Sequence, residues 1–431
     1  MTNSFSIVTP SYDGVHFAID GTKYNLKTLL MKSLSNKSLP KLRIRKRNEI
    51  RIVMGHPWIY SNEIENFAEI KSLEKGTLVE VCIKKDESFA LAYFNPHCLI
   101  AARILTYDAS QKINEEFFID RISSAKNLRE RFFDKPFYRL IHSEADFLPG
   151  LIIDRFDKVL SCQISTCGME KLLPILISAL EKTFPNCTII LRNDVDSRRM
   201  EGLELYTKVV KGEIPEDLIA EENGIKYSID VENGQKTGWF FDQRNNREFI
   251  GSLAQNRDVL DAFCYLGGFG LNALNNNAKS VTFIDSSQDA LKRLERNIEI
   301  NQFSRDKVEI ICDKVFDVLE KADFQNKKFD LVVLDPPAFI KSRKDFFVGI
   351  KGYEKLIKLS ANLVKKGGIL LLASCSHNAS LQDLIDAAND GFRKTKKSAK
   401  IIRIFGAGFD HPIHPALKES EYLKSIAFLV E

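Results

Sequence analysis

Two expected strand ends carry side chains that could do chemistry. One apolar run ends at Asp335, which two prolines follow, and another ends at Cys375, which Ser374 and Ser376 flank. A helical stretch from about Tyr353 to Lys366 separates the two runs. Because ligands of parallel α/β sheets bind beyond the carboxyl ends of the strands, we expect Asp335 and Cys375 to lie side by side on one crevice.

A thiol next to a carboxylate suits the methylation of a pyrimidine at carbon 5. That carbon becomes nucleophilic only after a thiolate has added to carbon 6 of the ring. Cys375 is the candidate nucleophile, and Asp335 is the candidate group that holds the base. The thiol needs a lowered pKa. His377 or a nearby lysine could lower it, and the sequence does not decide between them.

The residues that precede Asp335 have the pattern of a nucleoside-cofactor site. An expected strand at 258–264 leads through a glycine-rich turn into an expected helix at 268–276, and such turns let a ligand approach the backbone. Asp285 ends the next strand, where an acid can bind ribose hydroxyls, and Asp313 ends the third. We therefore expect S-adenosylmethionine (SAM) here, bound by Asp261, Phe263, Gly267, Asp285 and Asp313.

The elements that must position these residues form an alternating pattern from Gly224 onward. This pattern predicts an α/β fold with a doubly wound, mostly parallel, seven-stranded sheet. The expected strands lie at 258–264, 280–285, 307–312, 329–335, 368–374, 399–405 and 422–430. The expected helices lie at 268–276, 287–301, 353–366 and 380–391.

Two smaller units are expected before this sheet. Strand-like runs at 78–83, 89–94 and 99–105 predict a small β-barrel. A helix at 114–133 then leads to an α+β unit with strands at 151–154, 159–164 and 188–191 and a helix at 169–183. We predict four segments: an N-terminal extension at 1–38, the barrel at 39–112, a central α+β domain at 113–222 and the sheet domain at 223–431.

Composition limits the function further. The chain has 431 residues, of which 44% are hydrophobic and 28% charged, and no apolar run approaches the roughly 18 residues of a membrane span. We expect no membrane partner and, with no signal peptide in evidence, a cytoplasmic protein. The eight cysteines have neither zinc-site nor disulfide-framework spacing, so no metal is expected.

Basic residues are clustered although the net charge is only +4. The stretch 41–51 holds six basic residues and one acid, and further basic residues follow Asp335. Such clusters can contact phosphates, which indicates an RNA partner. The candidate RNA-binding residues are Arg43, Arg45, Lys46, Arg47, Lys341 and Arg343.

Several strings resemble the bacterial large-subunit ribosomal RNA cytosine-5 methyltransferases, over roughly residues 41–430. They are His56-Pro57-Trp58-Ile59-Tyr60-Ser61, Phe94-Asn95-Pro96, Leu148 to Arg155, Lys236 to Arg244, the glycine turn, Leu334-Asp335-Pro336-Pro337 and Ser374-Cys375-Ser376. The resemblance implies a PUA RNA-binding barrel, a central domain and a class I (Rossmann-like) SAM domain. It also implies Gln243 as a cofactor contact, ribosomal RNA or a ribosomal subunit precursor as partner, and a homodimer. Phe147 departs from the pattern, which has glycine there.

Three alternatives stay open. Enzymes that methylate base nitrogens also carry Asp-Pro-Pro but need no thiol, so Cys375 discriminates between the carbon and nitrogen reactions. A non-catalytic RNA-binding assembly factor would keep the fold without turnover. Gly268-x-Gly270-x-x-Ala273 also matches a dinucleotide fingerprint, but hydride transfer would need neither the Asp-Pro-Pro nor the thiol.

Overall fold

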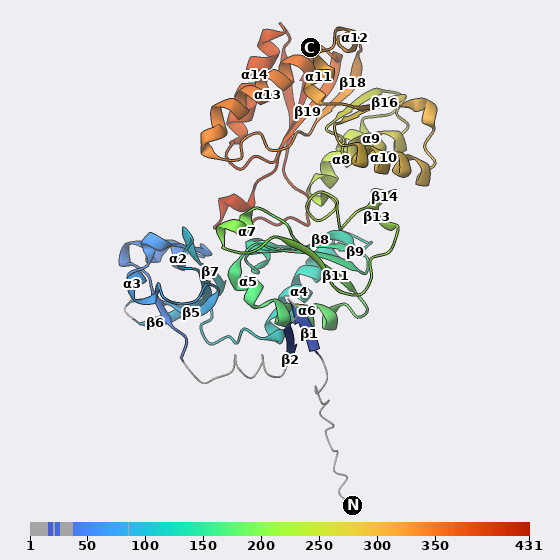
Figure 1. The fold of residues 1–431 in the computed structure, drawn as a ribbon. Coiled ribbons are helices and arrows are strands. Elements are labelled where there is room, and N and C mark those ends of the chain that lie inside the picture. The colour runs from blue at the N-terminus through green and yellow to red at the C-terminus, as the bar shows by residue number, and fades with distance from the viewer. Residues whose placement is uncertain (1–15, 20–21, 26–37, 85) are drawn as a thin grey trace, which may run out of the picture.

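The computed structural model describes residues 16–19, 22–25, 38–84 and 86–431, so most of the expected 1–38 extension lies outside the described residues. Strands β1 (His16–Ile19) and β2 (Thr22–Asn25) form a hairpin. After it the chain builds three larger sheets in sequence order, with the largest sheet at the opposite end of the molecule from the hairpin (Figure 1). In the part of the chain that is described, no helix has the length and apolar character needed to cross a membrane.

The first sheet is a five-stranded barrel in the order β3-β5-β6-β7-β4. Its strands are β3 (Lys41–Arg43), β4 (Trp58–Tyr60), β5 (Thr77–Ile83), β6 (Glu87–Phe94) and β7 (Ile100–Thr106), and its helices are α2 (Glu49–Val53) and α3 (Phe67–Ile70). The three predicted strands are confirmed. Strands β3 and β4 were missed, because three residues are too few to show an alternating pattern.

The second sheet has the order β12-β11-β10-β9-β8. Its strands are β8 (Phe137–His142), β9 (Leu151–Phe156), β10 (Val159–Ile164), β11 (Thr188–Asn193) and β12 (Tyr206–Lys211). Its helices are α4 (Glu115–Arg129), α5 (Cys167–Lys171), α6 (Leu173–Thr183) and α7 (Ser197–Met200). The single helix predicted at 169–183 is wrong: the chain breaks into two helices at Leu172, because Pro174 cannot donate the backbone hydrogen bond that a continuous helix needs.

The third sheet has seven strands in the order β17-β16-β15-β18-β19-β21-β20. Its strands are β15 (Asp258–Ala262), β16 (Ser280–Asp285), β17 (Val308–Cys312), β18 (Phe329–Leu334), β19 (Val364–Ser374), β20 (Ala399–Phe405) and β21 (Lys424–Val430). All pairings are parallel except those of β21. The predicted doubly wound fold is therefore confirmed.

Helices cover both faces of this sheet (Figure 1). They are α8 (Arg244–Ser252), α9 (Gly268–Asn275), α10 (Gln288–Ile300), α11 (Val315–Glu320), α12 (Ala322–Gln325), α13 (Phe346–Ala361) and α14 (Leu381–Lys394), and the hairpin β13 (Leu218–Glu222) and β14 (Ile225–Ile229) precedes them. Alternate residues of β18 face opposite cores: Leu331 packs with α9 and α10, and Val332 packs with α13 and α14. The helix predicted at 353–366 is wrong at both ends, since α13 begins at Phe346 and β19 already begins at Val364.

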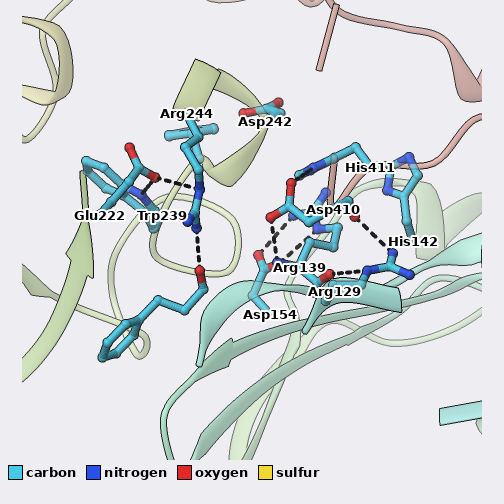
Figure 2. A network of polar contacts seen from close by, with 12 residues as sticks. Arg129, Arg139, His142, Asp154, Glu222, Trp239, Asp242, Arg244, Asp410 and His411 are labelled. Atoms are coloured by element: carbon cyan, nitrogen blue, oxygen red, sulfur yellow. Dashed lines mark hydrogen bonds and ion pairs between the residues drawn. The ribbon is translucent and has the colours of Figure 1, made fainter. Parts of the chain in front are cut away.

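A segment between β20 and β21, residues 406–423, leaves the third sheet and returns to the second (Figure 1). We call it the strap. Its Asp410 carboxylate accepts from the Arg139 backbone N–H at 2.9 Å, and its carbonyl accepts from Arg129 Nη2 at 2.9 Å. Arg139 also pairs with buried Asp154 at 2.8 Å (Figure 2). Asp154 accepts a further hydrogen bond from the Thr237 hydroxyl. The central domain thus holds both the strap and the loop that begins at Lys236.

Replacing Arg139 with methionine should destabilise the protein by about 3–5 kcal/mol, because Asp154 is fully buried and would lose its counter-charge. The free energy of unfolding in urea measures this. Arg296→Met is the matched control, since Arg296 pairs with Asp217 at the surface, where an ion pair contributes about 0–1 kcal/mol. Equal losses in the two variants would contradict the structural role of the buried pair.

Candidate active site

Asp335 and Cys375 follow two neighbouring strands at the same edge of the seven-stranded sheet. Strands β18 and β19 are parallel, with Leu334 opposite Leu372. Asp335 comes directly after β18, and Cys375 comes directly after β19. Their charges interact, since Asp335 raises the pKa of the Cys375 thiol. The expected juxtaposition of the two strand ends is therefore present.

The Asp335 carboxyl is held by the loop that contains Gln243. Gln243 Nε2 donates to Asp335 Oδ1 at 2.9 Å, and Gln243 Oε1 accepts from Asn246 Nδ2 at 2.5 Å. Asn246 in turn donates to Ser425 on β21 at 3.0 Å. Burial, and then the neighbouring Asp242, raise the pKa of Asp335 to about 7. Near neutral pH this carboxyl can therefore exist as a proton donor.

Asp242 is a second buried carboxylate at this site. One of its oxygens accepts from the Tyr422 hydroxyl, and Oδ1 has no partner among the described residues. Although burial raises its pKa, the charges of His411 and Lys236 lower it below the ordinary value of an aspartate. Asp242 therefore stays charged while Asp335 can be neutral, which separates the roles that the two carboxyls can take.

The backbone around Cys375 is held by hydroxyl groups. The Tyr353 hydroxyl, from α13, lies 2.7 Å from Ser374 Oγ and 3.0 Å from Ser376 Oγ. The Ile340 N–H donates to Ser376 Oγ at 3.3 Å, which ties the loop after Asp-Pro-Pro to the end of β19. The two serines that flank the thiol are both buried, so the cysteine backbone has little freedom.

The pKa of Cys375 is raised and not lowered as expected. Burial is the largest cause, and the charges of Asp335 and Asp242 add to it, whereas Lys236 lowers the pKa. Burial, together with the charges of Lys424 and Lys236, lowers the pKa of His377, so its imidazole is neutral at pH 7 and cannot stabilise a thiolate as a cation. A lysine therefore suits this role better than His377: Lys236 lowers the pKa of the thiol, and Lys424 also interacts with it.

Replacing Lys236 with methionine should raise the pKa of the Cys375 thiol, because the opposing positive charge is lost. The pH dependence of Cys375 alkylation by iodoacetamide, followed by peptide mass spectrometry, should shift to higher pH. Lys366→Met, which removes an exposed lysine, is the matched control and should leave the profile unchanged. A Lys236→Met profile that coincides with the wild type would contradict the assignment.

Asp261 lies at the end of β15, beside the turn into α9. Its Oδ2 accepts from the Gly270 N–H at 2.8 Å, and its Oδ1 is buried without a partner among the described residues. Burial, and then the charges of Asp335 and Asp285, raise its pKa to about 7. A cluster of carboxyls with raised pKa values fits a ligand that brings positive charge, and SAM carries both a sulfonium and an ammonium group.

The turn between β15 and α9 is strained. Phe263 and Tyr265 have φ of +62° and +50°, which L-residues rarely adopt, and Gly267 follows with +83°. Asp285 fixes this turn, since it accepts from the backbone N–H groups of Tyr265 and Ser287 at 2.9 Å each. Such strain is common where a backbone must present itself to a ligand.

The glycines of this turn also have a packing role that was not expected. A Cβ on Gly267 would lie 2.3 Å from Leu294, and one on Gly270 would lie 2.1 Å from Phe283. Both glycines therefore permit close packing of α9 against the protein interior. The part of the turn that is available to a ligand is its strained backbone. Nothing in the residue pattern distinguishes these two uses of glycine.

The remaining predicted residues are more loosely placed. Asp313 follows β17 and pairs with Lys321 at 2.7 Å, which lowers its pKa. Arg43 in the barrel pairs with Glu69 and Asp86, and its RNA-binding role stays a prediction. The other candidate RNA-binding residues are exposed, in the barrel and after Asp335 respectively: Arg45, Lys46, Arg47, Lys341 and Arg343.

Two functional candidates were missed from the sequence, Asp242 and Lys236. Both lie in the string from Lys236 to Arg244, where only Gln243 was singled out. The string itself could have indicated these two residues, because it contains several polar residues next to Gln243, the predicted cofactor contact. No sequence pattern shows that this loop lies against the ends of β18 and β19.

Comparisons with known proteins place the chain in a family. Residues 204–396 match the family model described as S-adenosylmethionine-dependent methyltransferase, and residues 42–107 match a PUA-like domain. Among curated proteins, the ribosomal RNA large subunit methyltransferase I of Aliivibrio fischeri is 38% identical over 380 residues, covering 86% of this chain and 94% of the relative. That of Photobacterium profundum is 36% identical over 384 residues, covering 87% and 96% respectively.

Solved structures share the fold. The crystal structure of SMU.776 complexed with SAH superposes with a TM-score of 0.78 at 21% identity, over 91% of this chain and 100% of that chain. A second structure, of a chain from Streptococcus mutans, has a TM-score of 0.76 at 21% identity over the same shares. At this identity the likeness supports the architecture of all three sheets and carries no argument on substrate.

Proposed function

We propose that this chain, which belongs to the SAM-dependent ribosomal RNA large subunit methyltransferase I family, forms 5-methylcytosine in large-subunit ribosomal RNA through a cysteine–RNA adduct. The observation that carries the proposal is the pair of strand ends. The thiol that directly follows β19 lies at the same sheet edge as the carboxyl that directly follows β18, and the pKa of about 7 lets this carboxyl act as an acid. A nitrogen methyltransferase would have no use for Cys375 at this position.

The cofactor side of the proposal assigns SAM to the edge formed by β15, β16 and β17. Asp261, the strained turn at Phe263 and Gly267, and Asp285 would hold it, and Asp313 would face its adenine. When bound, SAM supplies an electrophilic methyl group. Gln243 is engaged with Asp335 at 2.9 Å, so we assign it to the border between cofactor and base, where it positions Asp335.

The chemistry at the base begins with the thiolate of Cys375, which Lys236 favours electrostatically. Its sulfur bonds to carbon 6 of the cytosine while Asp335 gives a proton to ring nitrogen N3, so no charge builds up on the ring. Carbon 5 then takes the methyl group, and the sulfonium of the cofactor would be left as a neutral thioether. The carbon-5 proton passes to water, the electron pair of that C–H bond restores the C5–C6 double bond and expels the thiolate, and the N3 proton returns to Asp335.

The RNA must present the cytosine out of its stack, since a paired base would not reach a buried thiol. We assign the exposed residues Arg45, Lys46 and Arg47 of the barrel, and Lys341 and Arg343 beside the site, to phosphate contacts. The homodimer and the cytoplasmic location stay predictions.

The proposal is tested by identifying the product. Large-subunit ribosomal RNA is incubated with SAM carrying a labelled methyl group, digested to nucleosides and analysed by mass spectrometry. The label should appear in 5-methylcytidine. A labelled N-methylated purine or pyrimidine would support the nitrogen reaction instead, and RNA binding without SAM binding in calorimetry would support an assembly factor.

A further inference from the structure

A cavity of about 410 Å³ lies where the barrel, the central domain and the strap meet. The end of β7 lines it at Ile104 and Tyr107, the central domain contributes Arg121 from α4 and Phe147, and the strap contributes His414. The mechanism above uses none of these residues. The volume is within the range of about 300–1,000 Å³ that is usual for small-ligand sites.

Phe147 stands at this cavity in a strained conformation. Its φ of +57° and ψ of 25° are in the left-handed region, which favours glycine, and its side chain is 50% exposed. A bulky residue with such angles is rare and concentrates at functional sites. The ring is held in place, since the Arg121 guanidinium lies 5.2 Å from its centre and the His414 ring lies edge-on at 5.8 Å. The Phe147 ring is therefore kept at the cavity although its backbone conformation is unfavourable for a bulky residue.

Arg121 brings a positive charge into the same cavity without an acid of its own. It donates to the carbonyls of Leu105 and Phe147 at 3.2 Å each, and within the described residues no ion pair to it is found. The buried acid of the cavity, Glu144, is paired with Arg103 at 2.6 Å, and Asp120 lies exposed at the rim. Because burial lowers the pKa of Arg121, a bound anion would relieve an uncompensated charge.

We propose that this cavity binds one unpaired nucleotide of the RNA substrate, with its base stacked on Phe147 and its phosphate paired with Arg121. The inference rests on the proposed function, because it takes RNA as the substrate. Stacking on an aromatic ring and charge pairing with the backbone are the two contacts by which single-stranded RNA is usually bound.

The strap connects this cavity to the catalytic residues. His414 lines the cavity, and Tyr422, on the same segment, donates to Asp242 and lies 5.5 Å from the ring of His377. A nucleotide in the cavity would therefore touch the strap, which also contacts the loop that begins at Lys236. The site would anchor a neighbour of the target cytosine and orient the RNA across the crevice.

The test compares Phe147→Gly and Arg121→Gln with the wild type in fluorescence anisotropy, with a labelled single-stranded RNA of about 12 nucleotides. Each variant should bind about tenfold more weakly. Arg121→Gln should also lower the slope of log affinity against log salt by about 0.7, as expected for one phosphate contact to a single strand. Phe147→Gly should keep or raise the Tm, because glycine adopts φ of +57° without strain.

The matched control is Gln302→Gly. Gln302 is exposed, follows α10 and has φ of +56°, so the substitution relieves the same kind of strain away from the cavity. Its RNA affinity should equal that of the wild type. Photo-cross-linking of the same RNA carrying 5-iodouridine, mapped by mass spectrometry, should give an adduct at Phe147.

Affinities of Phe147→Gly and Arg121→Gln that match the Gln302→Gly control would overturn the proposal. If Phe147→Gly lowers the Tm, its affinity no longer tests the proposal. The salt dependence of RNA binding by Arg121→Gln and the cross-link at Phe147 then decide whether the nucleotide binds in the cavity. The readout is binding and not turnover, so it is separate from the reaction: an enzyme that methylated a nitrogen would leave this result intact. A wild type that bound no single-stranded RNA would overturn the nucleotide site alone, since the proposed reaction is tested separately by the identity of the methylated nucleoside.

Discussion

Replacing Cys375 with alanine should abolish methyl transfer to RNA, with a loss in kcat of at least about 10⁴-fold, because no other group in the crevice can add to carbon 6. The binding of SAM should be unchanged in calorimetry, since the thiol lies at the end of β19 and the predicted cofactor contacts lie on β15 to β17. Rates of methyl incorporation into ribosomal RNA under single-turnover conditions measure the effect.

The control for Cys375→Ala is Cys312→Ala, which removes an exposed cysteine at the end of β17 in the same sheet. This variant should keep the rate of the wild type. Full activity of Cys375→Ala would exclude the covalent mechanism and favour methylation of a nitrogen, which needs no thiol.

Replacing Asp335 with asparagine should lower kcat by about 10²–10⁴-fold, the usual contribution of a general acid. Asparagine keeps the size of the side chain and an oxygen for the Gln243 amide, but it cannot give a proton to N3 of the base. The loss should therefore appear in kcat more than in the affinity for RNA or SAM. Asp330→Asn, at the opposite end of β18, is the control and should retain activity.

The same residue should determine part of the pH dependence. The pKa of Asp335 is raised to about 7, so its acidic form is present below that pH and is lost as the pH rises through it. Because the pKa of the Cys375 thiol is raised, its thiolate fraction keeps growing over the same pH range and offsets the loss of the acid. In the wild type, kcat should therefore rise with pH up to about 7 and level off above it, whereas in Asp335→Asn it should continue to rise above pH 7. A profile unchanged by the substitution would contradict its role as the acid.

Strand ends could be predicted from the sequence because they combine two independent signals. The runs before Asp335 and Cys375 are apolar and short, and each stops at a polar residue. Strands β16 and β20 were predicted with the bounds that the structure has. Element boundaries without such a stop were predicted less well. Val364 to Lys366 read as the end of a helix, whereas the long strand β19 already includes them.

Contacts between distant segments could not be predicted, because no local pattern encodes them. The Lys236 loop is more than 90 residues before Asp335, and it reaches the site only because Asp154 binds Thr237 and Tyr422 binds Asp242. For the same reason the sequence does not indicate that the strap returns to the second sheet, where Asp410 accepts from the Arg139 backbone. The raised pKa of Cys375 likewise follows from burial, which the sequence of its neighbours does not give.

Covalent trapping tests the central claim most directly. Wild type and Cys375→Ala are incubated with SAM and ribosomal RNA that contains 5-fluorocytidine, and protein–RNA adducts are then sought under denaturing conditions. Fluorine cannot leave carbon 5 as a cation, so the methylated adduct cannot eliminate the sulfur. The mechanism predicts a denaturation-resistant adduct in the wild type that is missing in Cys375→Ala. A wild type that methylates the unmodified RNA and gives no adduct with the fluorinated RNA would contradict it.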